Sequence, residues 1–383
     1  MLNPQTLKDN NNRLIVLFLL YLLPAVCEYF FKWSNPITSE GFTYAPHWFS
    51  IFKILMQCLL LGAFLYPIRI KITPRNIFIW FCLILCFVDL VFYKYSHDLI
   101  NPNVVAITSL MVFIVFVGVL SNSKTKYILQ ESTIRFIFKI FMVGFVLQIL
   151  AYYFLDIKPS HSSAHFLFPR FNGLTNDSLA TGLFIPLFIP ILINNKTRVI
   201  DMLILISMSI ATGSLYSLFI TLFLLLFYLL YKKLFSLVFF ILLATVFFSI
   251  IFYQEISYIL SYKIDSILTH LDYFIKLYSN DQTNCEVVFC ESFLAQTKSI
   301  SWISTLLFYI CLGYMIKKLI NFGKEPTNSV VVHSILCLGF SILTASLFHP
   351  VIIIPFAINL FFIAFLMLSN AHTNSLNNLK VMS

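Results

Sequence analysis

Long apolar runs separated by short polar connectors recur along the whole chain. Runs of about 17 to 25 apolar residues are long enough to cross the hydrocarbon core of a membrane as helices. The seventh and eighth runs could instead form one long helix broken at Gly213. About twelve spans are predicted, at Leu14–Phe31, Phe49–Tyr66, Asn76–Tyr93, Asn103–Leu120, Ile134–Leu155, Ser178–Ile193, Val199–Gly213, Leu215–Tyr231, Leu234–Tyr253, Ile300–Met315, Ser329–Leu347 and Val351–Asn370.

Positive charge in the connectors predicts the orientation of these spans. Short loops rich in lysine and arginine stay on the cytoplasmic side of a membrane. Alternate connectors carry such residues, which predicts that both termini are cytoplasmic and favours two short helices meeting near Gly213. The residues are Lys8, Arg13, Arg69, Lys71, Arg75, Lys124, Lys126, Lys196, Arg198, Lys232, Lys233, Lys317, Lys318, Lys324 and Lys380.

Two segments on the predicted outer side, 156–177 and 254–299, are too long to be simple turns. Long connections in compact proteins are usually functional or disordered. The second segment has apolar residues at helical spacing in ISYILSYKIDSILTHLDYFIKLY. This spacing predicts an amphipathic helix along the membrane surface or over a cavity.

The composition agrees with this pattern. Of the 383 residues, 60% are hydrophobic and 11% are charged, whereas a soluble domain has about 25% charged residues. A soluble fold is therefore excluded, and 1–383 is predicted to be a single all-α polytopic membrane domain. The net charge of +9 lies mostly in connectors, where it could meet anionic lipid head groups, so no nucleic-acid partner is expected.

The eight cysteines fall into two groups. Six lie in apolar runs and are predicted to be packing residues: Cys27, Cys58, Cys82, Cys86, Cys311 and Cys337. Cys285 and Cys290 lie in the segment 254–299. They could close a small disulfide loop outside the cytoplasm, or they could remain free thiols.

Polar residues at the outer ends of spans are the first candidates for chemistry, because the common fingerprints of soluble enzymes are absent from the sequence. His161, His165 and Arg170 fall within ten residues, shortly before the helix predicted to begin at Ser178. Asp177 is a good helix-starting residue, and Gly173 permits a tight turn just before it. The Arg170 guanidinium suits a phosphate or pyrophosphate. His165 and Asp177 are candidate substrate-binding residues. Arg170 could also simply snorkel to lipid head groups, with solvated histidines beside it.

The segment 254–299 supplies Lys263, His270 and Lys276. Lys263 and His270 share a helix face about two turns apart. With Lys276 they could flank an anionic substrate, with His270 as a base. The three residues could equally form only the polar face of a surface helix.

Two more residues stand out between or within the spans. His349 precedes a proline between the last two spans, which predicts a position at the outer mouth, where it could act with Arg170 or cap the preceding helix. Asp89 lies within a predicted span and is a weaker functional candidate.

The stretch RFNGLTNDSLATGLFIPLFIPIL resembles the O-antigen polymerase and ligase superfamily, whose members often carry Arg-x-x-Gly followed by polar residues that lead into a span. Arg170, Gly173 and Asp177 occupy these places. The stretch ATGSLYSLFITLF is similar to the small, polar start of the family's next outer-facing helix, and the predicted topology agrees. Leu215 stands where many members have arginine, and the large loop has lysines where arginines are common.

The resemblance implies a GT-C-like fold and a Wzy-type polymerase of the bacterial inner membrane that uses no cofactor. Such an enzyme transfers a growing glycan from undecaprenyl pyrophosphate to the next lipid-linked repeat unit on the periplasmic face. Its partners would be the lipid-linked oligosaccharide, the lipid bilayer and a chain-length regulator protein. In the metal-independent mechanism, Arg170 and Lys263 hold the pyrophosphate while His270 or His349 activates the acceptor hydroxyl.

Three other classes of protein remain open. An O-antigen ligase uses the same donor but transfers the glycan to lipid A core, and the Phe-rich, Gly-poor composition favours a polymerase over it. A lipid-linked oligosaccharide flippase should show two related halves and a charged cavity, and no such halves are evident in the sequence. A purely structural membrane protein is disfavoured by the two long outer segments.

Overall fold

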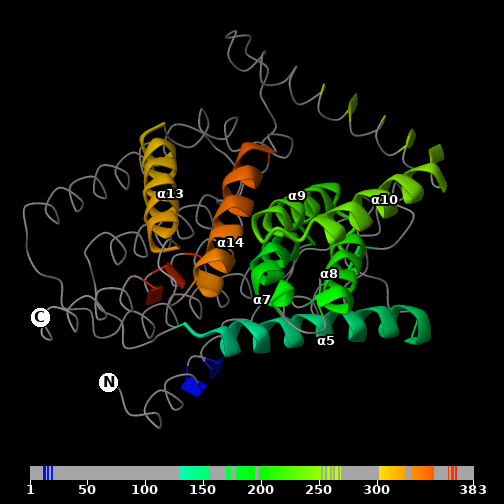
Figure 1. Ribbon diagram of the computed structural model, residues 1–383, viewed down its shortest axis with the longest axis horizontal. Helices are drawn as coiled ribbons and strands as arrows, with labels where there is room; N and C mark the ends of the chain where they lie inside the picture. The colour runs from blue at the N-terminus through cyan, green and yellow to red at the C-terminus, as the bar shows by residue number, and fades with distance from the viewer. Residues whose placement is uncertain are drawn as a thin grey trace, which may run out of the picture.

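The computed structural model describes most of the second half of the chain. It covers residues 129–155, 170, 171, 173, 178–194, 198–251, 302–323 and 329–348, with further residues at 12, 13, 15, 16, 19, 253, 254, 257, 258, 261, 264, 265, 268, 361, 364, 365, 367 and 368. Every regular element among these residues is a helix, which confirms the all-α prediction for this part of the chain. In chain order they are α5 Glu131–Leu155, α6 Ser178–Phe184, the 3-10 helix η1 Ile185–Phe188, α7 Ile189–Ile193, α8 Arg198–Ala211, α9 Leu215–Tyr231, α10 Phe235–Ile251, α13 Trp302–Phe322 and α14 Ser329–Phe348 (Figure 1).

The helices follow the predicted apolar runs closely, with one correction. The run predicted to end at Met315 continues as α13 to Phe322. The predicted end was too early because lysines after an apolar stretch do not stop a helix. Lys317 points outward, and the Nζ atom of Lys318 lies 4.9 Å from the centre of the Tyr314 ring.

Only part of the predicted membrane topology is visible in the described residues. One helix there, α5, is long and apolar enough to cross a membrane by length and composition. The stretches Thr181–Ile193, Leu215–Tyr231, Phe235–Phe247 and Val330–Ser346 are apolar but shorter. The count of about twelve spans therefore stays a prediction.

The centre of the described bundle is the segment formed by α6, η1 and α7. Every side chain from 181 to 193 is buried. Pro186 and Pro190 stand at the starts of η1 and α7, where proline lacks the N–H that would continue the preceding helix. The segment packs against α14, α8, α9 and α5, so the broken helix lies inside the bundle (Figure 1).

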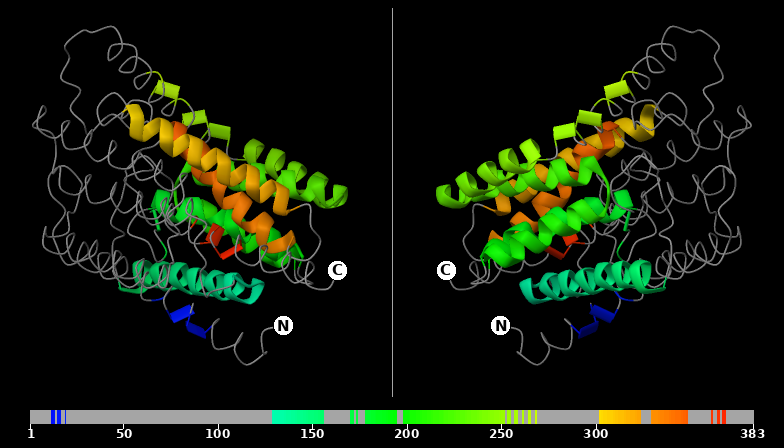
Figure 2. Two further views of the ribbon diagram at one scale, coloured as in Figure 1. Left: turned by 90° about the vertical axis from the view of Figure 1, so that its left-hand side faces the viewer. Right: turned by 90° about the vertical axis from the view of Figure 1, so that its right-hand side faces the viewer.

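Helix α5 forms one flank of this bundle, and both views of Figure 2 show it along one side of the other helices. Its inward face repeats at helical spacing. Phe138 lies against Phe188 with ring centres 5.2 Å apart, and Phe141 lies 5.7 Å from Phe184. Its outward face is apolar and exposed, at Val143, Val146, Leu147 and Leu150.

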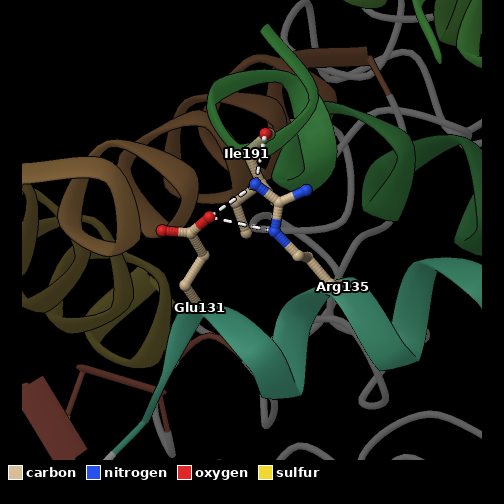
Figure 3. A network of polar contacts seen from close by, with 3 residues as sticks. All are labelled: Glu131, Arg135 and Ile191. Atoms are coloured by element: carbon tan, nitrogen blue, oxygen red, sulfur yellow. Dashed lines mark hydrogen bonds and ion pairs between the residues drawn. The ribbon is translucent and has the colours of Figure 1, made fainter. Parts of the chain in front are cut away.

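A charged contact joins the start of α5 to the end of α7 (Figure 3). The Nη2 atom of Arg135 lies 2.6 Å from Oε1 of Glu131, and the same nitrogen donates to the carbonyl of Ile191 at 3.3 Å. The last carbonyls of a helix lack partners within it, so an arginine there satisfies a group that would otherwise be unbonded. The contact places Arg135 at the end of the bundle where α7 stops.

The ends of α5, α7, α9, α13 and α14 meet at this same end. The ring of Tyr231, in the last turn of α9, lies 5.2 Å from that of His333 in α14. Gly323, just after α13, lies beside His333. Glu131 is close enough to Tyr228 to act on it electrostatically, and the Asn194 side chain is close enough to hydrogen-bond it. We call this region the basic end, because it carries Arg135, Arg198, Lys232, Lys233, Lys317 and Lys318.

Close contact between α6 and α9 gives a first testable prediction. A Cβ atom on Gly182 would lie 2.6 Å from Cβ of Ser217. We expect Gly182→Ala to destabilise the protein by about 1 to 3 kcal/mol, the usual cost of overpacking a filled interior. Thermal unfolding in detergent micelles measures this change. The double variant Gly182→Ala/Ser217→Gly should recover part of the loss, and independent, additive effects would contradict the contact.

Candidate functional site

The turn between α8 and α9 organises the end of the bundle opposite the basic end. Gly213 has φ of +60°, a conformation that glycine adopts without steric cost. The N–H of Gly213 donates to Ile210 O at 2.9 Å, and the Thr212 hydroxyl donates to Ser209 O at 2.7 Å. The chain reverses here, so the residues predicted as either two spans or one broken helix form two antiparallel helices.

Hydroxyl groups hold the two helices together below this turn. Ser209 of α8 lies 3.0 Å from the hydroxyl of Ser217 and donates to Thr221 at 3.2 Å, both in α9. Ser214 caps α9 by accepting a hydrogen bond from the backbone N–H of Ser217. Ser209, Ser217 and Thr221 are fully buried. The hydrogen bonds among them offset the hydrogen bonds to water that their hydroxyl groups lose on folding.

Arg170 packs directly on this turn. The N–H of the next residue, Phe171, donates to Ala211 O at 2.8 Å. A Cβ atom on Gly213 would lie only 2.6 Å from Cγ of Arg170. The aliphatic stem of the half-buried Arg170 therefore occupies the space that any other residue at 213 would need. The two sequence stretches that carry the family resemblance, RFNG and ATGS, meet at this contact.

Gly173 is fixed from the other side by α5. The side chain of Gln148 bonds both backbone groups of Gly173: it accepts from the N–H at 2.9 Å and donates to the carbonyl. Gly173 has φ of +60°, and a Cβ atom there would lie 3.0 Å from the Phe145 ring. Phe171 and Gly173 are therefore held between α5 and the α8–α9 turn. Gln148 was missed in the sequence, although a lone glutamine in the long apolar run of α5 could have indicated it.

Two tyrosines tie α14 to the same end. The Tyr216 hydroxyl, in the first turn of α9, bonds Ser341 O and the Thr344 hydroxyl. The Tyr309 hydroxyl of α13 donates to Ser346 O at 3.3 Å. The ends of α9, α13 and α14 are thus joined by hydrogen bonds, and no periodic pattern in the sequence pointed to these pairs.

Of the predicted site residues, the structure describes Arg170 and brings it to the α8–α9 turn. The other candidates lie outside the described residues, and their roles stay predictions: His161, His165, Asp177, Lys263, His270, Lys276 and His349, the pair Cys285 and Cys290, and Asp89. The described residues between 253 and 268 are all helical, in agreement with the helix predicted there. Cys337 is a buried free thiol, as predicted for a packing residue.

The described residues contain no group of side chains that could bind a metal ion. Among those residues, no three His, Cys, Asp or Glu side chains are grouped as a metal site requires. The candidate histidines lie outside them, so the metal-independent mechanism stays a prediction.

Compared with models of protein families, with curated proteins and with solved structures, the chain gives no match. The resemblance to the O-antigen polymerase and ligase superfamily therefore rests on the sequence stretches around Arg170 and Gly213 and on the predicted topology.

The Arg170–Gly213 contact predicts a marked effect of Gly213→Ala. A left-handed backbone costs about 1 to 2 kcal/mol for a residue with a Cβ atom, and the new methyl group would also displace Arg170. We expect a lower unfolding temperature in detergent micelles. Gly313→Ala is the matched control, because nothing lies within 4 Å of a Cβ atom there. Equal unfolding temperatures for the two variants would contradict this account of the turn.

Proposed function

We propose that the chain is a Wzy-type O-antigen polymerase, a glycosyltransferase of the bacterial inner membrane that extends a lipid-linked glycan on the periplasmic face. The observation that carries the proposal is the contact between Arg170 and Gly213. It joins the two stretches that resemble the polymerase and ligase superfamily at one end of a helical bundle, away from the basic end.

The distribution of side chains supports a location in the membrane. Large apolar side chains face outward from α9 and α10, among them Phe219, Phe223, Phe227, Phe239 and Phe247, each more than half exposed. Besides its large apolar side chains, the interior contains small hydroxyl side chains, namely Thr181, Ser209, Ser217, Thr221, Ser334 and Ser341. An apolar exterior with small polar residues between helices is typical of helices packed in lipid.

The two ends of the bundle support the proposed orientation. Lysines and arginines gather at the basic end, which the positive-inside rule assigns to the cytoplasm. Arg170 and the α8–α9 turn lie at the opposite end of α8 and α9 and would therefore face the periplasm. Lipid-linked repeat units are polymerised on that side.

The proposed reaction is a displacement at the anomeric carbon of the donor glycan. An acceptor hydroxyl oxygen of the next repeat unit bonds to this carbon. The bond from carbon to the pyrophosphate oxygen breaks, and its electron pair leaves with undecaprenyl pyrophosphate. The acceptor proton passes to a base, for which His270 and His349 are the candidates.

Arg170 suits the leaving-group side of this reaction. Its guanidinium can form two parallel hydrogen bonds to pyrophosphate oxygens. The N-terminus of α9 begins two residues after Gly213, and the positive end of its helix dipole adds to the same electrostatic field. Charge develops on the leaving group as its bond breaks, so a preorganised positive site would lower the barrier.

The proposed topology predicts the behaviour of reporter fusions. Alkaline phosphatase is active only when exported, so a fusion after Gly213 should be active and a fusion after Lys233 inactive. Green fluorescent protein fused at the same two points should give the opposite pattern. Equal phosphatase activity at both points would rule out the antiparallel crossing of α8 and α9.

The proposed role of Arg170 predicts a defect in polysaccharide length. A deletion strain should make lipopolysaccharide with core plus one repeat unit, and wild-type protein should restore the ladder on a gel. Arg170→Gln keeps a stem over Gly213 but removes the charge. We expect it to reduce polymer by about a hundredfold, the scale seen when one charge-stabilising donor is lost.

Arg198→Gln is the matched control for this experiment, because Arg198 is exposed at the basic end. It should restore the ladder at equal expression. A deletion strain with bare core would favour the ligase or the flippase instead, and a full ladder from Arg170→Gln would remove Arg170 from the mechanism.

A further inference from the structure

A second polar cluster lies at the basic end, and the proposed glycan transfer does not use it. Tyr228, Tyr231 and Lys232 at the end of α9 meet His333 of α14. The His333 ring is 5.8 Å from that of Tyr228 and 5.2 Å from that of Tyr231. The Nζ atom of Lys232 is 5.6 Å and 5.8 Å from the centres of the same two tyrosine rings. We call these four residues the tyrosine–lysine cluster.

The way α9 ends separates two neighbouring lysines. The N–H of Leu234 donates to Leu229 O and that of Lys233 to Leu230 O, each at 2.9 Å. This is the Schellman pattern, and Lys233 occupies its left-handed position with φ of 57°. Lys232 is consequently half-buried over the tyrosine rings, whereas Lys233 is exposed.

Lys232 and Tyr231 are the members of the cluster on α9 that reach the protein surface. Among the described residues, no carboxylate forms an ion pair with Lys232. The Nδ1 atom of His333 is buried without a hydrogen-bond partner among them. The Tyr228 hydroxyl is also buried, and the Asn194 side chain is close enough to hydrogen-bond it. The rings hold the ammonium group by cation–π attraction without neutralising its charge.

We propose that the tyrosine–lysine cluster binds the phosphate of an anionic phospholipid from the cytoplasmic leaflet. The Lys232 ammonium and the hydroxyl of the 57% exposed Tyr231 are suitable donors to phosphate oxygens, with Tyr228 and the Nδ1 atom of His333 buried beneath them. The location rests on the proposed topology, in which the basic end lies at the cytoplasmic head groups. Tyrosine is enriched at that depth because its ring is apolar and its hydroxyl is polar.

The surface around the cluster favours a lipid over a soluble phosphate. On α9, Phe223, Phe227 and Tyr231 are 55%, 64% and 57% exposed and follow one another at i, i+4 spacing, so they share the helix face that ends at the cluster. These side chains form an apolar surface on which acyl chains can lie while the phosphate contacts Lys232. A free phosphate would gain nothing from that surface.

The test uses the purified full-length chain in neutral detergent. Dioleoyl phosphatidylglycerol, dioleoyl phosphatidylcholine or inorganic phosphate is added, and the unfolding temperature is followed with concentration. We expect phosphatidylglycerol alone to raise it in the wild type. Lys232→Gln and Tyr231→Phe should each bind phosphatidylglycerol about tenfold more weakly, the effect of losing a charge-assisted hydrogen bond.

Lys233→Gln is the matched control, since it removes the same charge from the neighbouring residue. It should change the apparent affinity by less than about twofold. Native mass spectrometry provides a second measurement, in which Lys232→Gln should retain fewer phosphatidylglycerol molecules than Lys233→Gln. Each variant is compared with its own unfolding temperature in phosphatidylcholine, which separates lipid binding from folding.

Three outcomes overturn the proposal. Equal stabilisation by phosphatidylcholine shows that the phosphodiester charge is not recognised. Equal stabilisation by inorganic phosphate assigns the site to a free anion. An equal loss in Lys233→Gln and Lys232→Gln shows only a general attraction to the basic end.

Discussion

The packing of Arg170 on the left-handed turn at Gly213 is the contact on which the rest of the described structure depends. Only a residue without a Cβ atom fits there, because Cγ of Arg170 occupies the space. The turn reverses the chain between α8 and α9, so Arg198 at the start of α8 and Lys232 after α9 fall at one end of the bundle. It also supplies the carbonyl of Ala211 that fixes Phe171, and so determines where the chain before α6 lies. The separation of the two ends follows from this one turn.

Small residues extend that constraint into the bundle. Gly182 allows α6 to touch Ser217, and Ser217 in turn shares a hydrogen-bonded group with Ser209 of α8. Buried hydroxyl groups need partners, and here they find them on neighbouring helices rather than in water. The Pro-broken segment at the centre is therefore surrounded by close contacts, while bulky phenylalanines of α9 and α10 face outward. This arrangement supports the proposed position of the helices in lipid.

The proposed functions place different chemistry at the two ends of the same helices. Glycan transfer would occur beside Arg170, and phospholipid would bind around Lys232. Helices α9 and α14 connect the two regions, because Tyr216 bonds Thr344 at one end and Tyr231 meets His333 at the other. A lipid bound between α9 and α14 would thus hold the two helices that also border the proposed catalytic end. The two ends would be connected through the rigid helices α9 and α14 themselves, without a change of conformation.

The sequence by itself determined where the helices lie, because an apolar run is a local property: Leu215–Tyr231 was predicted and is found as α9. It also indicated Gly213 as a break, and Arg170 as a residue of interest. The end of α13 could not be read in this way, since lysines do not stop a helix. Only the tertiary structure decided that Arg170 lies on Gly213, that Gln148 binds Gly173 and that Tyr216 bonds Thr344. The two hydrogen-bonded pairs are 25 and 128 residues apart in the sequence. No periodicity along the chain encodes which distant side chains meet.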